Sequence, residues 1–464
     1  MIGEAVSENA TESPEAAAAK FLGSLRKPAH ILVAVSGGSD SIGLLVMLAD
    51  CLKTFPHPEI TLSAATIDHG LRPESAAEAV VVAALCSRLG ITHVTRRWEG
   101  DKPRSGLMAA AREARYELLA DATADLGANV IVTAHTLDDQ LETLAMRGAR
   151  LADGEPGVGT GIADAVLFDR RIWVIRPLLA CRRDNIRAYL TNREISWIDD
   201  PSNDDPHYER VRTRKYLATL KNLPTVPVYA GAARAAISAA AADWLESHVI
   251  IHAAALAEIR TPGLDADSAV LAYALSNLTA VLGGQSFGLG RERLRRILDF
   301  IGERSPGRRT SGGVVFDLRS SGLYMMRESR GIEPLVLAPG EHGVWDGRFE
   351  IVNGGATSVR VEPSGNGGAT ALATTLPKAA VYRAGAVLPH IIHLGGQTSL
   401  GAGTIVHVAP YFAPFDRFLT RFDLCFANRL AISFGRKPYL QPPLSGLLTE
   451  NASVGADYLG KGHA

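Results

Sequence analysis

A chain of 464 residues exceeds the size at which a single hydrophobic core usually stops growing, so we expect two or three domains. Its 47% hydrophobic and 21% charged residues are typical of a globular protein and exclude a disordered or fibrous chain. The formal net charge of −1 excludes a general attraction to nucleic acid, so any nucleic-acid surface must be a local patch.

The four cysteines, Cys51, Cys86, Cys181 and Cys425, are too far apart in sequence to form a C-x-x-C pair. We interpret them as small buried side chains, which favours a reducing cytoplasm over a disulfide framework. The first ten residues carry glutamates where a signal peptide needs positive charge, and no later stretch approaches membrane-spanning length. We therefore expect a cytoplasmic protein without a membrane segment.

The first part of the chain is expected to alternate strands and helices after an N-terminal tail of about 13 residues. The strand candidates are Ile31–Val35, Ile60–Ile67, His93–Trp98, Asn129–Thr133 and Ile172–Ile175. The helix candidates are Pro14–Leu25, Ile42–Cys51, Glu74–Leu89 closed by Gly90, and a helix over residues 109–116 that Ser105 can cap. This alternation predicts an α/β fold with a doubly wound parallel sheet.

Four polar clusters follow four of these strands. They read SGGSDS from Ser36, DHGLR from Asp68, AHTLDDQLET from Ala134 and RPLL from Arg176. The carboxyl ends of parallel strands meet at one edge of a sheet, and ligands bind there. The sequence therefore predicts that four loops line one crevice.

The cluster Ser36–Ser41 predicts a phosphate loop. Gly37 and Gly38 let the backbone approach a ligand closely, and the following helix start presents unpaired amide hydrogens and a positive dipole end to an anion. The cluster fits neither the lysine-containing phosphate loop nor the G-x-G-x-x-G loop. In place of a lysine it carries Asp40, whose carboxylate would be repelled by phosphates unless Mg²⁺ lies between them. The alternative is an ordinary turn whose Ser and Asp side chains cap a helix.

The AHTLDDQLET cluster is acidic, and helical spacing places His135 above Asp139 and Asp138 above Glu142. Such carboxylates repel one another unless they are solvated or meet a cation, which could be Mg²⁺ or the ammonium of a substrate. The alternative is a solvated acidic helix start, which the helix dipole favours but which does not account for His135 at the strand exit.

In the DHGLR cluster, His69 or Arg72 is a candidate contact for a nucleotide. The alternative is a turn whose arginine pairs with a surface carboxylate. Neither Cys51 nor Cys86 is expected at a strand end, where a sulfur-transfer enzyme would need a nucleophilic thiol.

Two runs are rich in arginine and are candidate nucleic-acid patches. Arg170–Arg193 holds seven arginines against one acid, and Arg291–Arg309 holds seven against three acids. A solvated basic helix face remains the alternative for each run.

The residue composition of the chain changes twice after these motifs, at residue 230 and again beyond Gly307. Residues 230–259 are alanine-rich and predict a helix with Trp244, Leu245 and Val249 as apolar anchors. Beyond Gly307 come the β-prone runs Val314–Leu318, Gly322–Met326, Phe349–Val352 and Ser358–Val361, and then a linker-like stretch, Ser364–Thr375. The predicted organisation is a tail and leading helix at 1–25, a catalytic domain at 26–216, a helical domain at 217–304 and a β-rich domain at 305–464.

Several motifs together resemble those of the tRNA(Ile)-lysidine synthases, a family within the PP-loop ATP pyrophosphatase superfamily. They span about residues 30–215, and they are SGGSDS at 36–41, DHGLR at 68–72, AREARY at 111–116, His135 with DDQLET at 138–143, RPLL at 176–179, and DPSND at 200–204 with Tyr208, Arg210 and Arg214. The phosphate loop alone indicates only the superfamily, whereas DDQLET and DPSND indicate lysidine synthesis.

The resemblance implies a ligase that uses ATP to adenylate the C2 oxygen of the wobble cytidine in a CAU-anticodon isoleucine tRNA, releasing pyrophosphate. The lysine ε-amine then displaces AMP. The catalytic residues that it implies are Asp40, Arg112, His135, Asp139, Glu142 and Arg214. ATP is assigned to Ser36, Gly37, Gly38, Ser39, Asp40, Ser41, His69 and Arg72, with Asp40 also holding Mg²⁺, and the substrates are assigned to Arg115, Asp138 and Arg176.

Two departures from the family pattern leave questions open. The stretch 210–214 keeps three arginines but has Val211 and Thr213 between them, so Arg210, Arg212 or Arg214 could act. The glycine segment Gly154–Gly161 is looser than in the family. Beyond residue 307 no motif matches, and only analogy assigns a tRNA contact to that part. The rival hypotheses are a tRNA thiolase of the same superfamily and a non-catalytic tRNA-binding protein on this fold.

Overall fold

The computed structural model describes residues 11–150, 160–199, 207, 209–220, 230–365, 367–368, 372, 375–394 and 406–445. The chain divides into two compact units. The first unit comprises residues 1–234 and 441–464, and the second comprises residues 235–440.

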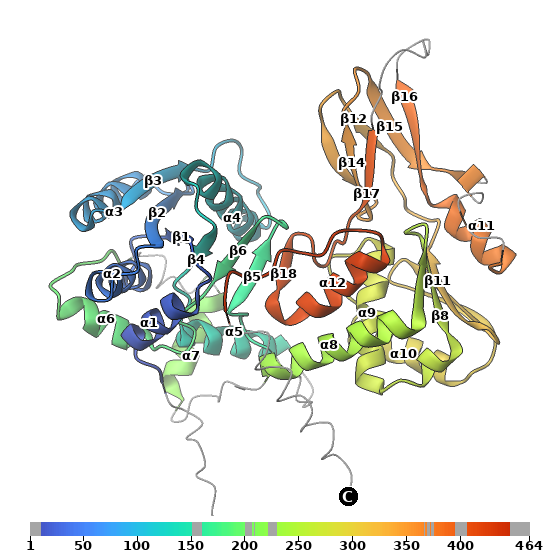
Figure 1. The fold of residues 1–464 in the computed structure, drawn as a ribbon, viewed down its shortest axis with the longest axis horizontal. Helices are drawn as coiled ribbons and strands as arrows, with labels where there is room; N and C mark the ends of the chain where they lie inside the picture. Colours follow the sequence, from blue (N-terminus) through green and yellow to red (C-terminus); the bar gives the residue numbers. More distant parts are fainter. Residues whose placement is uncertain are drawn as a thin grey trace, which may run out of the picture. The chain divides into compact units, whose positions relative to one another are not determined.

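The first unit is built on a mainly parallel sheet (Figure 1). Its strands are β1 (Ala29–Ala34), β2 (Ile60–Asp68), β3 (Thr92–Arg97), β4 (Val130–Val132), β5 (Ala165–Phe168) and β6 (Ile172–Ile175), in the order β5-β6-β4-β1-β2-β3. β1 pairs in parallel with β2 and β4, and β4 pairs in parallel with β6. The central residues Ile31, Leu32 and Val33 are fully buried, as expected for a strand covered on both faces. The predicted α/β class with a parallel sheet is confirmed.

The helices of this unit lie between and around the strands, and α2, α3 and α4 pack on the sheet. They are α1 (Pro14–Ser24), α2 (Ser39–Thr54), α3 (Ser75–Leu89), α4 (Leu107–Leu126), α5 (Leu137–Arg150), α6 (Arg183–Thr191) and α7 (Glu209–Thr219). α2 contacts β1 and α6, whereas α3 and α4 contact β2 and β3. The loops after β1, β2, β4 and β6 therefore open at one edge of the sheet, as the sequence predicts.

Two local predictions for this unit are wrong. Strand and helix do not alternate throughout, because β5 pairs antiparallel with β6 through a tight turn in which Asp169 and Arg170 both adopt positive φ. A tight hairpin turn of this kind usually contains Asn and Gly, so Asp169 and Arg170 gave no sequence signal for it. Ser105 does not cap α4, because the N-cap position is Gly106 at φ +68° and no side chain caps the helix.

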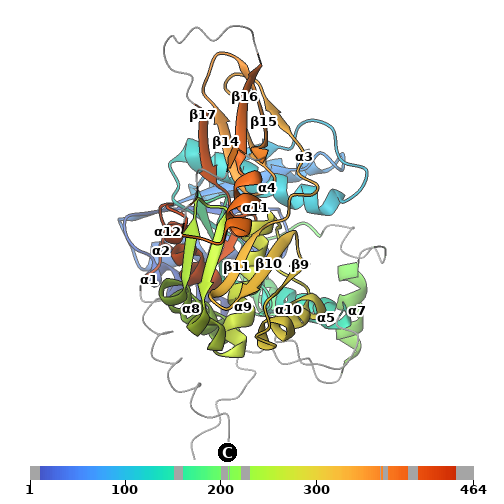
Figure 2. The ribbon, with the colours of Figure 1, turned by 90° about the vertical axis from the view of Figure 1, so that its right-hand side faces the viewer.

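The second unit begins with helices and a five-stranded antiparallel sheet (Figure 2). Its first elements are α8 (Ala230–His248, entering from the first unit), β7 (Val249–His252), β8 (Leu256–Arg260), η2 (Thr261–Asp265), α9 (Ser268–Gly283), α10 (Arg291–Gly302), β9 (Gly307–Ser311), β10 (Val314–Arg319) and β11 (Gly322–Arg327). The strand order is β7-β8-β11-β10-β9, so the sheet joins strands from both sides of the expected boundary at residue 304. The domain boundaries drawn from the sequence stay predictions.

The helix expected over residues 230–259 is wrong beyond His248, because the chain turns there into the β7–β8 hairpin. Ala253 and Ala254 make the turn with positive φ, a conformation that alanine rarely adopts. Because alanine has a high helix propensity, the sequence predicted a continuing helix there. The expected anchors Trp244, Leu245 and Val249 are buried.

Two three-stranded antiparallel sheets complete the second unit. One contains β12 (Leu335–Leu337), β15 (Ser358–Pro363) and β16 (Pro389–Leu394), and the other contains β13 (His342–Trp345), β14 (Phe349–Asn353) and β17 (Val406–Pro410). Trp345, Phe349 and Val359 belong to their shared core. The remaining elements are α11 (Lys378–Ala386), β18 (Phe418–Thr420), η4 (Arg421–Asp423) and α12 (Leu424–Ser433). The expected β-prone runs beyond Gly307 are confirmed as strands, whereas half of the linker-like stretch 364–375 lies outside the described residues.

A search of the described helices for one long and apolar enough to cross a membrane finds none.

Candidate active site

The loop between β1 and α2 holds the residues expected to bind phosphate. Gly37 adopts φ +88°, and a Cβ there would lie 3.0 Å from Ile198 Cδ1, so a glycine is required. Gly38 is the N-cap of α2, and no side chain caps the helix there. Amide hydrogens of its first turn are therefore available to an anion at the positive end of the helix dipole.

The serines shape this loop rather than cap the helix. Ser41 Oγ accepts a hydrogen bond from Ser36 N at 3.1 Å and donates one to the Gly38 carbonyl at 3.0 Å. Ser39 and Ser41 are buried. The loop is thus held in a curled conformation before any ligand arrives.

The carboxylate of the loop, on Asp40, faces an arginine that the sequence did not single out. Arg183 Nε, from the start of α6, donates to Asp40 Oδ2 at 2.8 Å. Burial raises the pKa of Asp40, and Asp139 adds to the rise, while the Arg183 guanidinium opposes it. Asp40 therefore lies in a crevice where its charge needs a nearby cation.

The acids of α5 converge on the same crevice. Asp139 forms a capping box with Thr136, because its Oδ2 accepts a hydrogen bond from Thr136 N at 2.7 Å and Asp139 N donates to Thr136 Oγ1 at 3.4 Å. Its other oxygen, Oδ1, points to the arginines. Glu142, one turn further, is 1% exposed, and Asp138 Oδ2 accepts a hydrogen bond from Arg183 N at 2.8 Å. The alternative of a solvated acidic helix start is therefore not what the structure contains.

Arginines from α6 and α7 neutralise these acids. Arg210 donates to Asp139 Oδ1 and to Glu142 Oε2, both at 2.6 Å, and Arg214 Nε donates to Glu142 Oε1 at 2.8 Å. Arg183 lies 3.4 Å from Asp139 and 3.9 Å from Glu142. Positive groups thus already occupy the places where a substrate ammonium could bind.

The geometry separates the three arginines of α7. Arg210 and Arg214 are one helical turn apart and both face α5. Arg212 instead donates to the carbonyl of His207. The i, i+4 spacing of Arg210 and Arg214, matched to the acids of α5, is the sequence signal that could have favoured this pair.

A second cluster, here called the arginine pocket, consists of Arg112, Arg115, Arg176, Tyr116 and His135. The guanidinium carbons of Arg112 and Arg115 lie 5.1 and 5.3 Å from the centre of the Tyr116 ring, and Arg176 Nη2 donates to Tyr116 Oη at 3.3 Å. The Nε atoms of Arg115 and Arg176 are buried and have no hydrogen-bond partner among the described residues. Cations gathered without carboxylates at a crevice favour an anionic ligand.

The histidine of this pocket, His135, is half-buried, and its Nδ1 lies 3.0 Å from Thr133 Oγ1. Burial, followed by the charges of Arg176, Arg115 and Arg112, holds the pKa of His135 well below its ordinary value. The imidazole is therefore neutral near pH 7 and can exchange hydrogen bonds with a polar substrate without carrying charge.

The DHGLR loop follows its strand as expected, and most of its polar side chains have local partners. Arg72 pairs with Glu78 of α3 at 3.0 Å, and the rings of His69 and Trp98 are perpendicular with their centres 6.1 Å apart. His69 Nδ1 is buried and has no hydrogen-bond partner among the described residues. Asp68 Oδ1 accepts hydrogen bonds from Gly70 N and Ser75 Oγ. The DPSND motif at 200–204, Tyr208 and most of Gly154–Gly161 lie outside the described residues.

The cysteines do not provide an activated thiol. Cys86 and Cys181 are buried as expected, whereas Cys51 is half-buried and Cys425 is exposed, which corrects the expectation for those two. Burial raises the pKa of Cys86 to about 11 and that of Cys181 to about 12, and desolvation also raises the pKa values of Cys51 and Cys425. A thiol with a raised pKa is a poor nucleophile at neutral pH, which counts against sulfur transfer.

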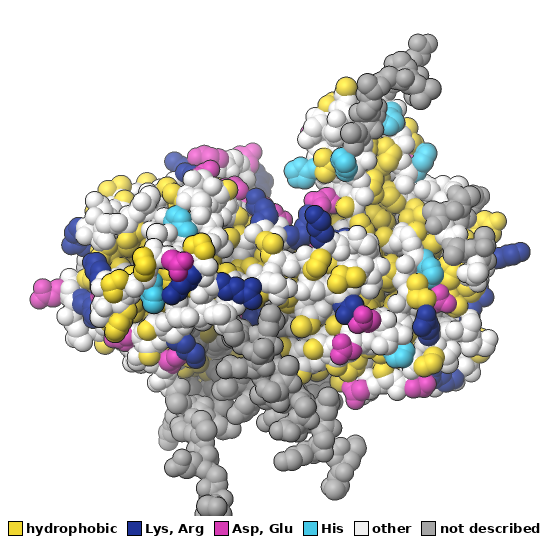
Figure 3. Space-filling model, in the orientation of Figure 1, with side chains coloured by type: hydrophobic (Ala, Val, Ile, Leu, Met, Phe, Trp, Pro, Cys, Tyr) yellow, Lys and Arg dark blue, Asp and Glu magenta, His cyan; other side chains and the backbone are white. Residues whose placement is uncertain are grey.

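The charged surface is mixed rather than uniformly basic. On the face that Figure 3 shows, Lys and Arg side chains lie in small groups among acidic and uncharged ones. In the first arginine run, Arg182 pairs with Asp138 at 3.0 Å and Arg193 pairs with Asp50 at 2.9 Å. Much of that run therefore serves internal ion pairs.

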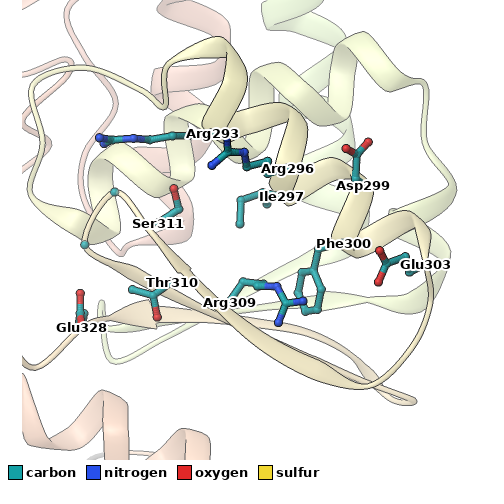
Figure 4. A pocket seen from close by; sticks show the side chains of 12 residues that line it. Arg293, Arg296, Ile297, Asp299, Phe300, Glu303, Arg309, Thr310, Ser311 and Glu328 are labelled. Atoms are coloured by element: carbon teal, nitrogen blue, oxygen red, sulfur yellow. The ribbon is translucent and has the colours of Figure 1, made fainter.

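The second arginine run borders a groove of about 630 Å³ in the second unit (Figure 4). Arg293 and Arg296 of α10 face Ser311 and Arg309 of β9 across it, and Arg309 lies 5.2 Å from the centre of the Phe300 ring. Asp299 and Glu303 lie toward the other end. Phe300 lies on the side of these two acids, and Glu328 lies on the opposite side, near Ser311. The groove is called here the α10 groove, and the part where its arginines and hydroxyl groups gather is called its basic end.

The chain is similar to a protein-family model and to several known proteins. A family model described as a PP-loop domain matches residues 10–220. A tRNA(Ile)-lysidine synthase from Rhizobium meliloti (strain 1021) is 44% identical over 444 residues, covering 93% of this chain and 98% of the relative. One from Mesorhizobium japonicum is 37% identical over 436 residues, covering 89% and 94%. A solved structure, the U34-tRNA thiolase NcsA from Methanococcus maripaludis, is 16% identical with a TM-score of 0.37 over 45% of this chain and 72% of that one, a likeness too weak to bear on function.

Proposed function

The chain belongs to the tRNA(Ile)-lysidine synthase family, and on that premise we propose how its own residues carry out the reaction. The activity is the ATP-dependent joining of lysine to isoleucine tRNA. We place it at C2 of the wobble cytidine of a CAU anticodon, through an adenylated cytidine that yields AMP and pyrophosphate, and in the cytoplasm. The observation that carries this proposal is the convergence of a lysine-free phosphate loop, an acid cluster and the arginine pocket at one sheet edge.

The phosphates of ATP are assigned to the loop 36–41. The amide hydrogens of the first turn of α2 and the loop hydroxyls are donors that suit phosphate oxygens. Within the ranges that the structure describes, no three acidic, His or Cys side chains form a metal site by themselves. Asp40 nevertheless fits Mg²⁺, because this ion is commonly held by one or two carboxylates together with substrate phosphates. When bound there, Mg²⁺ would neutralise phosphate charge.

The arginine pocket is assigned to the wobble cytidine and the α-phosphate. Arg112, Arg115 and Arg176 supply positive charge where negative charge develops as the cytidine oxygen attacks phosphorus. The neutral His135 can hydrogen-bond the base without repelling those arginines. Adenylation makes the C2 oxygen a good leaving group, because AMP leaves far more readily than a carbonyl-like oxygen.

The lysine ammonium is assigned to Asp139 and Glu142, with Asp138 at the edge of the same cluster. A carboxylate can hold the ammonium and accept the proton that the amine must lose before it attacks. Since Arg210 and Arg214 now occupy these oxygens, lysine binding exchanges one cation for another rather than burying a new charge pair.

The proposal is tested with purified protein, ATP, Mg²⁺, labelled lysine and a CAU-anticodon isoleucine tRNA transcript. We expect labelled tRNA together with pyrophosphate, and a modified nucleoside heavier by the mass of lysine less water. No incorporation by a folded protein would contradict the proposal. A nucleoside mass showing sulfur instead would establish the thiolase, and tRNA binding without pyrophosphate release would establish a non-catalytic protein.

A further inference from the structure

Helix α6 presents two arginines to the phosphate loop. Arg183 Nε lies 2.8 Å from Asp40 Oδ2, and Arg187 Nε lies 3.3 Å from Ser39 Oγ. The two arginines are spaced i, i+4, so they lie on the same face of α6. Their contacts are with the first two residues of α2, where the loop would hold an anion.

The position of α6 relative to the loop is fixed by close packing. A Cβ at Gly43 of α2 would lie 2.3 Å from Ile186 Cγ2, so the two helices approach closely only because residue 43 is a glycine. At the far end of the pair, Asp50 of α2 accepts hydrogen bonds from Tyr189 Oη at 2.8 Å and Arg193 Nε at 2.9 Å. Arg183 and Arg187 are therefore held at the loop by a rigid helix pair.

Both guanidiniums keep donors for a further ligand. Among the described residues, Arg183 also makes a long hydrogen bond of 3.4 Å to Asp139 Oδ1 and lies 3.9 Å from Glu142. Arg187 pairs at 3.1 Å with Asp199, whose side chain is largely exposed, so that contact is weak. Arginine has five donors in a planar fork that suits phosphate oxygens.

We propose that Arg183 and Arg187 bind the β- and γ-phosphates of ATP and so supply the positive charge that the lysine-free loop lacks. The proposal rests on the proposed function, because it takes ATP to lie on this loop. As the cytidine oxygen bonds to the α-phosphorus, the bond from that phosphorus to the bridging oxygen breaks. Its electron pair goes to pyrophosphate, whose growing negative charge the two guanidiniums stabilise.

The test uses inorganic pyrophosphate and AMP as inhibitors of lysine incorporation by the full chain. For Arg183→Gln and Arg187→Gln we expect the KM for ATP and the inhibition constant of pyrophosphate to rise about 10- to 100-fold, since a hydrogen bond to a charged group is worth about 1.5–3 kcal/mol. Inhibition by AMP, which lacks the outer phosphates, should stay within about twofold of wild type. Arg183→Lys should recover part of the loss, because it restores the charge without the fork.

Arg193→Gln is the matched control. It removes an arginine that follows the C-terminus of the same helix and pairs with Asp50 of α2, at the end remote from the loop. We expect its KM for ATP and its pyrophosphate inhibition to match wild type. If it behaved like Arg183→Gln, loosening of α6 would be the cause and the proposal would fall.

Two other results would overturn the proposal: pyrophosphate inhibition unchanged in both glutamine variants, or AMP inhibition weakened as much as pyrophosphate inhibition. Calorimetric titration of the free proteins with magnesium pyrophosphate gives a readout that needs no ligation. Wild type that binds pyrophosphate but incorporates no lysine would contradict the proposed function alone. Equal binding by wild type and Arg183→Gln would contradict the assignment of that arginine.

Discussion

Glu142 is the most enclosed acid of the candidate site. It is 1% exposed, and Arg210 and Arg214 donate to its two oxygens while Arg183 lies 3.9 Å away. A buried carboxylate between several cations is held close to positive charge and keeps a fixed orientation. Those are the properties that a group needs in order to orient an ammonium and take its proton.

We expect Glu142→Gln to reduce lysine incorporation about 100-fold or more, because an amide neither balances the ammonium charge nor accepts its proton. Release of pyrophosphate from ATP in the presence of tRNA should fall much less, since adenylation requires no lysine. Parallel assays of the two half-reactions measure this. An equal fall in both, in protein with a normal thermal melt, would mean that Glu142 maintains the whole site rather than the lysine half.

Tyr116 has an unusual proton equilibrium for a buried phenol. Burial raises its pKa, but Arg176, Arg115 and Arg112 outweigh burial and lower the pKa to about 7, against 10.0 for an ordinary tyrosine. Between about pH 7 and pH 10 the unfolded chain therefore binds more protons at this residue than the folded chain does. Stability from Tyr116 grows as pH rises through that range and is lost as pH falls through about 7.

We therefore expect the free energy of unfolding of wild type, minus that of Tyr116→Phe, to increase between pH 7 and pH 9. The slope is at most about 1.4 kcal/mol per pH unit, and the difference should be constant below about pH 6. Urea unfolding at a series of pH values measures it. A difference that stays constant from pH 6 to pH 9 would show that the phenol remains protonated.

At the scale of elements, the sequence predicted what is local and missed what is distant. The loop 36–41 could be recognised because a buried strand, two glycines and a helix start are adjacent in sequence. Arg183 could not, because its partner Asp40 lies 143 residues away and it stands in a run with six other arginines. An arginine run indicates a charged surface only if no acids from elsewhere meet it, and here the acids of α2 and α5 do.

The sequence alone did not decide which of Arg210, Arg212 and Arg214 acts, whereas the structure shows which of them lie on the face of α7 that meets α5. We expect Arg210→Gln and Arg214→Gln each to lower kcat/KM for lysine incorporation at least about 10-fold, because each removes one of the charged donors that hold the buried Glu142. Arg212→Gln should stay within about twofold, since Arg212 contacts the backbone at His207. Steady-state kinetics of the three variants decide the matter, and a loss in Arg212→Gln comparable to the others would refute this helical phase.

At the scale of the whole molecule, a net charge of −1 must coexist with a polyanionic substrate. The arginines of the first run are largely neutralised by acids, so the first unit does not attract tRNA through that run as a whole. In the second unit, α10 also pairs some arginines internally, such as Arg295 with Glu292 and Asp299. The basic end of the α10 groove offers two further arginines, Arg293 and Arg309, to phosphate, and we propose a tRNA contact there.

Reversing the charge at the basic end of the α10 groove tests whether that end binds tRNA without affecting the ATP site. We expect the double variant Arg293→Glu, Arg309→Glu to raise the KM for tRNA about 10-fold or more. The slope of log affinity against log salt concentration should become shallower by roughly one for each phosphate that the variant no longer neutralises. Magnesium pyrophosphate binding should be unchanged, because neither arginine belongs to the first unit. Arg295→Gln is the control, as that arginine already holds two acids on its own helix. An unchanged salt slope in the double variant would mean that tRNA binds at another surface. A phosphate that loses its arginine must take up a counterion from solution, so losing real contacts at this groove has to change the slope.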